Sequence, residues 1–171
     1  QMKTLVSWNA LITGYVQNGS GREALECFRQ MQDEGISPDV VTFTCILGAS
    51  GIVGSLEVGE DVHAKIQKQG LLQNDMVLGT ALVDMYAKCG KLEKAQEVFD
   101  DLQTRDVVSW TLIITGHTQY GAYKQALRCF EQMQFEGVHP NQITLVYALK
   151  SCGCIRDIFK GQQLHIYVET H

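Results

Sequence analysis

The sequence has few prolines, few basic residues and no long apolar run. Two prolines occur in 171 residues, and 14 Lys and Arg stand against 19 Asp and Glu, for a formal net charge of -5. This acidic balance argues against a protein that grips nucleic acid mainly through phosphates, because that mode needs many cations to displace counterions. It does not exclude a protein that reads bases. The longest apolar stretch, near residues 45–54, is about half the roughly 20 residues of a membrane span, so no transmembrane segment or membrane partner is predicted.

The length and the apolar content favour a folded domain. A chain of this size buries about 70% of the surface that its unfolded form exposes. Because 45% of the residues are hydrophobic, wholesale disorder is not expected. The N-terminus lacks the order of a signal peptide, which is a charged segment followed by an apolar one. Either the compartment is cytosol-like or a targeting segment has been removed.

The cysteines do not have the spacing of a metal site or of a disulfide framework. One C-x-C occurs and no C-x-x-C, whereas structural zinc uses pairs two to four residues apart. A secreted disulfide scaffold is normally shorter and denser in Cys. The sequence therefore predicts buried free thiols, no metal and a reducing compartment. The six cysteines are Cys27, Cys45, Cys89, Cys129, Cys152 and Cys154.

The sequence repeats itself at a spacing of 102 residues. At this shift Val6-Ser7-Trp8 aligns with Val108-Ser109-Trp110, and roughly a third of the overlapping positions are identical. The long period subdivides into units of about 35, 36 and 31 residues, each with two helix-like segments and a glycine between them. The predicted units are residues 4–38, 39–74, 75–105, 106–140 and 141–171, preceded by a short tail, residues 1–3, that aligns with the end of the third unit.

The first unit shows the pattern of two amphipathic helices. Its first segment places one apolar face at helical spacing, and Asn18-Gly19 then supplies a helix end. The second segment ends at Gly35, and Pro38 prevents continuation. The two faces are Trp8, Leu11, Ile12, Tyr15 and Val16, then Ala24, Leu25, Phe28 and Met31.

A unit of two such helices cannot bury its own apolar face, so neighbouring units must stack. The predicted fold is all-α: about ten helices in antiparallel pairs that form a right-handed α-solenoid. The first helices line one side of such an array. Side chains that recur there once per unit can read a linear polymer.

Three repeated motifs carry a family resemblance. They are V-S-W-[NT]-x-[LI]-I-T-G, A-L-x-C-F-x-Q-M and G-[IV]-x-P. Together with the order of the three unit lengths, they resemble pentatricopeptide repeats of the plant PLS subclass. The resemblance covers essentially the whole chain. It implies that residues 4–38 and 106–140 are P repeats, 39–74 and 141–171 are L repeats with the last one partial, and 75–105 are an S repeat. We expect a segment of a longer array, without a capping repeat at either end and with residues 1–3 as the tail of a preceding S repeat.

The resemblance implies single-stranded RNA binding with one base per repeat. In this family two positions per repeat select the base: the fifth residue of the first helix and the residue just before the next repeat. Thr with Asp goes with guanine, Thr with Asn with adenine, and Asn with Asp with uracil, so the predicted target is 5′-U-(G)-G-A-3′, with the bracketed base read less dependably by an L repeat. The pairs are Asn9 with Asp39, Thr44 with Asp75, Thr80 with Asp106 and Thr111 with Asn141, and Val146 opens a fifth pair.

Two further sets of residues follow from the resemblance. Apolar residues near the start of each first helix would sandwich the bases, as a stacking platform does. Lys88 at the end of a first helix could contact the RNA backbone, or could equally be a solvated helix-terminal charge. The sandwiching residues are Val6, Val41, Val77, Val108 and Ile143.

Enzymatic interpretations lack their motifs. A zinc deaminase needs H-x-E followed by P-C-x-x-C, and a phosphate-binding loop needs GxxxxGK[ST]; neither occurs. We interpret His63 and His165 as packing residues and Trp8 and Trp110 as core, and we predict no catalytic residue, no cofactor and no small-molecule substrate.

The predicted function is RNA targeting for an organellar processing or cytidine-to-uridine editing factor. The expected location is the mitochondrion or the chloroplast, and an editing accessory protein is a possible further partner. The alternative is a tetratricopeptide-like scaffold for protein binding, which also stacks helix pairs of about 34 residues.

Overall fold

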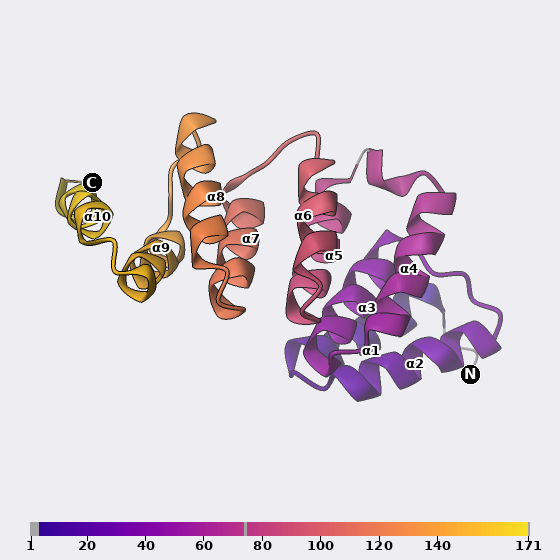
Figure 1. Ribbon diagram of the computed structural model, residues 1–171. Coiled ribbons are helices and arrows are strands. Elements are labelled where there is room, and N and C mark those ends of the chain that lie inside the picture. The colour runs from indigo at the N-terminus through magenta and orange to yellow at the C-terminus, as the bar shows by residue number, and fades with distance from the viewer. Residues whose placement is uncertain (1–3, 74, 171) are drawn as a thin grey trace. The chain divides into compact units, whose positions relative to one another are not determined.

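The structure, a computed structural model, describes residues 4–73 and 75–170, and these residues form ten α-helices and no strand (Figure 1). The chain divides into two compact units between Lys91 and Leu92. The first unit holds α1 (Leu5–Gln17), α2 (Gly21–Asp33), α3 (Val40–Val53), α4 (Leu56–Lys68), the short 3-10 helix η1 (Leu71–Gln73) and α5 (Met76–Lys88). The second unit holds α6 (Leu92–Asp100), α7 (Val107–Gln119), α8 (Tyr123–Phe135), α9 (Gln142–Ile155) and α10 (Ile158–Thr170).

In the first unit, helices pair along the chain and the first helices pack side by side. Helix α1 contacts α2, α3 contacts α4, and α3 also contacts both α1 and α5. The core between them is apolar and fully buried, because each helix carries an apolar stripe at 3.6-residue spacing. Its largest members include Trp8, Ile12, Met31, Phe43, Ile46, Leu47 and Leu82.

The second unit repeats this arrangement. Helix α7 contacts α6, α8 and α9, and α9 contacts α10. Phe99 of α6 meets Trp110 of α7 edge to face, with ring centroids 4.6 Å apart. Arg105 closes the loop between these helices, since its guanidinium donates to the carbonyl oxygens of Phe99 at 3.2 Å and Asp100 at 2.9 Å. Trp8 and Trp110 are both fully buried, which confirms the prediction that they are core residues.

The first helices of the predicted repeats are α1, α3, α5, α7 and α9. Each of them begins directly after a polar residue whose side chain caps it. The side-chain oxygen accepts a hydrogen bond from a backbone N–H in the first turn of the helix, where intrahelical partners are lacking. The capping residues are Thr4, Asp39, Asp75, Asp106 and Asn141. Four of the five are the residues that the sequence resemblance assigns to base selection.

The repeat boundaries remain a prediction. The division of the chain after Lys91 falls inside the predicted unit 75–105, between α5 and α6. The predicted tail, residues 1–3, lies outside the described residues.

Several burial predictions are wrong. Cys154 is exposed although Cys152 is buried, because residues two apart on a helix point to nearly opposite sides. Cys45 and Cys89 are only partly buried, and none of the six cysteines, all of which lie in the described residues, is in a disulfide. His165 is exposed rather than packed, whereas His63 is partly buried and its Nδ1 lies 2.8 Å from the Tyr86 hydroxyl. Leu11 is also exposed, since α1 buries only Trp8 and Ile12.

Among the described residues, every helix is too short or too polar to cross a membrane.

Candidate nucleic-acid interface

The second residue of each first helix is an apolar side chain that is exposed to water. Between 50% and 76% of the surface of each one is accessible. Burying such a side chain would stabilise the fold by about 1.5–3 kcal/mol, so core packing does not explain its place. Single exposed apolar residues are common, but here one helix position is exposed in five helices. The residues are Val6, Val41 and Val77 in the first unit, and Val108 and Ile143 in the second.

The first predicted pair, Asn9 and Asp39, is in direct contact. The amide Nδ2 of Asn9 donates to both carboxylate oxygens of Asp39, at 3.0 and 3.1 Å. The hydroxyl of Thr42, the third residue of α3, donates to Asn9 Oδ1 at 2.6 Å. These bonds assign the amide orientation, with the oxygen toward Thr42 and the nitrogen toward Asp39.

Asp39 caps α3 while it holds Asn9. Its Oδ1 accepts from the backbone N–H of Thr42 at 2.8 Å. Partial desolvation raises the pKa of Asp39, but hydrogen bonds from the Thr42 backbone, the Thr42 hydroxyl and the Asn9 amide outweigh it, and the net pKa lies below the ordinary value. Asp39 is therefore ionised at neutral pH and can only accept hydrogen bonds.

The pair Thr111 and Asn141 is joined through a third side chain. Both the backbone N–H and the hydroxyl of Thr144 donate to Asn141 Oδ1, each at 2.8 Å. The same hydroxyl lies 2.9 Å from that of Thr111, which donates to the Val107 carbonyl at 2.5 Å. With both lone pairs of Oδ1 in use, the NH₂ group carries the remaining hydrogen-bonding capacity of Asn141. Thr111 itself is buried, so it offers space rather than a hydrogen bond.

The other predicted residues are arranged differently. Thr44 donates to the Val40 carbonyl at 2.9 Å, and Asp75 Oδ1 accepts from the backbone N–H groups of Val77 at 3.0 Å and Leu78 at 3.1 Å. Thr80 lies in the first unit and Asp106 in the second, where Asp106 forms a reciprocal capping box with Ser109. Val146 is exposed.

Lys88 forms an ion pair within its own helix. Its ammonium lies 2.7 Å from the carboxylate of Asp84, one turn earlier. The pairing partly neutralises the charge that was predicted to contact the RNA backbone. That contact stays a prediction.

Sequence reasoning missed the role of Thr42 and Thr144. Each is the third residue of a first helix and fully buried. A signal was present, because Thr at the third position after an Asp or Asn cap is a pattern that can return a side-chain bond to the cap. The contact of each with the first helix of the preceding repeat, 33 residues earlier, could not be predicted from local sequence.

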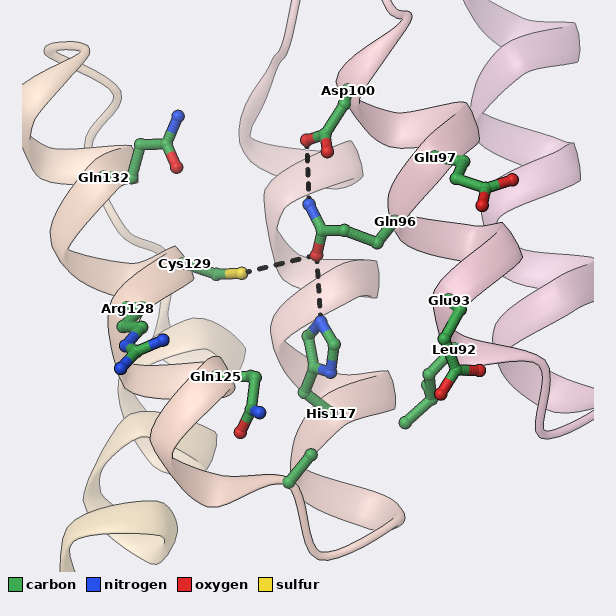
Figure 2. A pocket seen from close by; sticks show the side chains of 11 residues that line it. Leu92, Glu93, Gln96, Glu97, Asp100, His117, Gln125, Arg128, Cys129 and Gln132 are labelled. Atoms are coloured by element: carbon green, nitrogen blue, oxygen red, sulfur yellow. Dashed lines mark hydrogen bonds between the residues drawn. The ribbon is translucent and has the colours of Figure 1, made fainter.

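Sequence reasoning also missed a cavity in the second unit, of about 510 Å³, between α6 and the α7–α8 pair. Figure 2 shows Gln96 at its centre, with Oε1 2.9 Å from His117 Nε2 and 3.8 Å from the Cys129 thiol. Burial lowers the pKa of His117, although the Glu93 charge opposes this, and burial with the Asp100 charge raises the pKa of Cys129 to about 11. The thiol is thus protonated at neutral pH, and the cluster lacks the thiolate of a cysteine nucleophile. Within the described part of the chain, no three His, Cys, Asp or Glu side chains form a metal site.

Comparison with known proteins gives consistent matches. Residues 3–50 and 105–154 match the PPR repeat family, and residues 80–107 match the PPR repeat. One pentatricopeptide repeat-containing protein of Arabidopsis thaliana is 43% identical over 94% of this chain and 28% of its own length. A second is 36% identical over 98% of this chain and 33% of its own length, and a third, named as chloroplastic, is 37% identical over 95% and 20%. The chain thus spans a third or less of the length of these relatives.

A solved structure has the same fold. The crystal structure of the pentatricopeptide repeat protein PPR10 in complex with an 18-nt psaJ RNA element superposes with a TM-score of 0.78 at 19% identity, over 99% of this chain and 26% of PPR10. PPR10 from maize gives a TM-score of 0.71, over 97% of this chain and 25% of that one. This likeness and the described helices confirm the predicted all-α fold of the solenoid class.

Proposed function

Because the chain belongs to the pentatricopeptide repeat family, we propose that it is a non-catalytic module that binds single-stranded RNA and selects one base per repeat. The observation that carries the proposal is the double use of the helix caps. Four of the residues assigned to base selection, Asp39, Asp75, Asp106 and Asn141, also cap first helices, and an exposed apolar residue lies two positions after each of these caps. The solved complex of PPR10 with RNA supports RNA as the ligand class.

When Asp or Asn caps a helix, one side-chain oxygen is used by the cap and a second group is left for a ligand. That second group has opposite hydrogen-bonding polarity in the two residues. One oxygen of either side chain must accept from the backbone N–H of the helix. Asp then has a second oxygen, which only accepts, whereas Asn has an NH₂ group, which only donates. Asp106 and Asn141 both cap in this way and differ in the remaining group.

These polarities fit the predicted bases. The carboxylate of Asp106 suits guanine, whose Watson–Crick edge carries the donors N1–H and N2–H, while the NH₂ of Asn141 suits the N1 acceptor of adenine. At the first pair, a donor on Asn9 lies beside an acceptor on Asp39, which suits uracil with its N3–H between two carbonyl groups. The proposed target remains 5′-U-(G)-G-A-3′.

We further propose that the longer protein acts in organellar RNA processing or cytidine-to-uridine editing, in the chloroplast or the mitochondrion, with an accessory protein as a possible partner. The chloroplastic relative supports the first compartment. The repeat lengths of the PLS kind support the editing role.

The test is the substitution Asn141→Asp, assayed by fluorescence anisotropy at low ionic strength against RNAs that contain 5′-UGGA-3′ or 5′-UGGG-3′. Both residues are good helix caps, so the fold is retained. The unmodified chain should favour UGGA by about tenfold, which corresponds to one good base contact, and the variant should favour UGGG. The matched variant Asp106→Asn should move the preference at the preceding base from guanine to adenine.

Two results would contradict the proposal. An unchanged preference in both variants would show that the pairs are assigned wrongly. No measurable binding, or equal affinity for scrambled RNA, would reject sequence-selective binding by this chain and favour the protein-binding scaffold.

A further inference from the structure

We propose that Thr42 and Thr144, the third residues of α3 and α9, are positioning residues for base selection. The inference rests on the proposed function and deepens it. Each hydroxyl joins two base-selecting side chains from consecutive repeats into one hydrogen-bonded network. The distances are 2.6 Å from Thr42 to Asn9 and 2.9 Å to Asp39, and 2.9 Å from Thr144 to Thr111 and 2.8 Å to Asn141.

The first network controls which atom of Asn9 lies where. An Asn side chain can rotate by half a turn about its last bond, which exchanges the donor and the acceptor. The network opposes this rotation, because after it the Asn9 oxygen would face the Asp39 carboxylate, which only accepts, and the Thr42 hydroxyl would lose the oxygen to which it donates. Since Thr42 is fully buried, water cannot replace the lost partner without a change in packing.

The second network likewise fixes which atom of the Asn141 amide faces the helix, namely Oδ1. This oxygen accepts two hydrogen bonds from Thr144, and removal of the hydroxyl leaves only the backbone bond. The NH₂ group that is proposed to face adenine would then be held less firmly. Thr111, whose hydroxyl donates to the Val107 carbonyl, would also lose its 2.9 Å contact with the Thr144 hydroxyl of the next repeat.

Three of the pairs lie within one compact unit, and among these the third position differs at Thr44 and Asp75. After the Asp75 cap this residue is Leu78, which has no hydroxyl, and Asp75 Oδ1 accepts from the backbone N–H groups of Val77 and Leu78. The inference therefore explains in physical terms why the bracketed base, assigned to Thr44 and Asp75, would be read weakly.

The test compares Thr42→Val and Thr144→Val, which keep the side-chain shape and remove the hydroxyl. Affinities of the 171-residue chain are measured at low ionic strength for RNAs that differ only at the first or the last base of 5′-UGGA-3′. The preference of about tenfold at the matching base should fall to about threefold or less, while the preference at the other base is unchanged. The conservative variants Thr42→Ser and Thr144→Ser should restore it.

Thr118→Val is the matched control for a purely structural effect. The Thr118 hydroxyl also bridges two first helices, lying 2.9 Å from the Ser151 hydroxyl, and it is buried. Its removal should lower the melting temperature as much as Thr144→Val does and leave both base preferences intact.

The outcomes separate the inference from the proposed function. If the unmodified chain shows no base preference, the proposed function is wrong. If it shows the preference and the Val variants keep it, or if Thr118→Val reduces it equally, base selection stands and the positioning role is rejected.

Discussion

Asp39 stabilises a helix and is proposed to select a base with the same carboxylate. Its Oδ1 caps α3 and its Oδ2 contacts Asn9. A residue in this place cannot be exchanged freely, because among residues with side chains only Asp, Asn, Ser or Thr caps well. The cap requirement thus limits this position to a few side chains, and among these Asp and Asn offer opposite polarity to a base.

Arg156, the residue that ends α9, has a left-handed backbone conformation. The equivalent residue at the end of α3 is Gly54, which has the same conformation. The φ angles are 59° at Arg156, after α9, and 73° at Gly54, after α3. A side chain with a Cβ is strained in this region by about 1–2 kcal/mol, and part of this is offset by the greater freedom of Gly in the unfolded chain. We predict that Arg156→Gly raises the free energy of unfolding by about 0.5–1 kcal/mol, measured by urea denaturation.

Gly54→Ala is the matched control, since nothing lies within 4 Å of the added Cβ. It should lower the free energy of unfolding by about 1 kcal/mol through backbone strain alone. A destabilised Arg156→Gly variant would mean that the arginine side chain stabilises the fold by more than its backbone strain costs.

Some residues were predictable from sequence and others were not. Asp106 and Asn141 could be placed at helix starts because their types cap and an apolar periodic segment follows. The exposure of Cys154 could not be predicted, because the apolar pattern near it does not show which side of α9 packs against a neighbouring helix. The bridging role of Thr42 needs a contact with a residue 33 positions away, and local sequence carries no record of such a contact.

At the level of the helices, the sequence predicted the pairs well because each helix has its own apolar stripe and a clear end. The distance between two packed helices was not predictable in this way, because it depends on individual side-chain atoms at the contact. Gly21, the first residue of α2, lies against α3, and a Cβ there would come within 2.7 Å of Val53 Cγ2 and 2.9 Å of the Ala49 carbonyl oxygen. The sequence showed a glycine near a helix start but not the neighbour that requires it.

We predict that Gly21→Ala lowers the free energy of unfolding by about 1–3 kcal/mol, because α2 must move away from the backbone of α3. The control is Gly14→Ala in α1, where nothing lies within 4 Å of the new Cβ. That variant should be more stable by about 0.5–1 kcal/mol, the gain of Ala over Gly inside a helix. Equal effects of both substitutions in urea denaturation would show that the α2–α3 contact can relax.

For the whole molecule, the net charge of -5 restricts how the proposed RNA ligand can be held. Several of the 14 basic residues are paired with carboxylates, which leaves less positive charge for phosphates. They are Arg29, Lys88, Arg105 and Lys160, with Glu26, Asp84, Glu136 and Glu131 as their partners. The proposed RNA binding would then depend mainly on the exposed apolar residues and on hydrogen bonds to base edges.

This balance predicts a weak dependence of RNA affinity on salt. For single strands the slope of log K against log salt concentration is roughly -0.7 for each neutralised phosphate, so a module that contacts one or two phosphates should give a magnitude below about 2. The measurement is a titration of 5′-UGGA-3′ RNA at increasing KCl. Replacing Val108 by Ala should reduce the affinity at every salt concentration without changing the slope, because it removes a stacking surface and no charge. A slope as steep as -4 would instead mean that phosphates dominate, and base selection by the caps would then contribute little to the affinity of this chain.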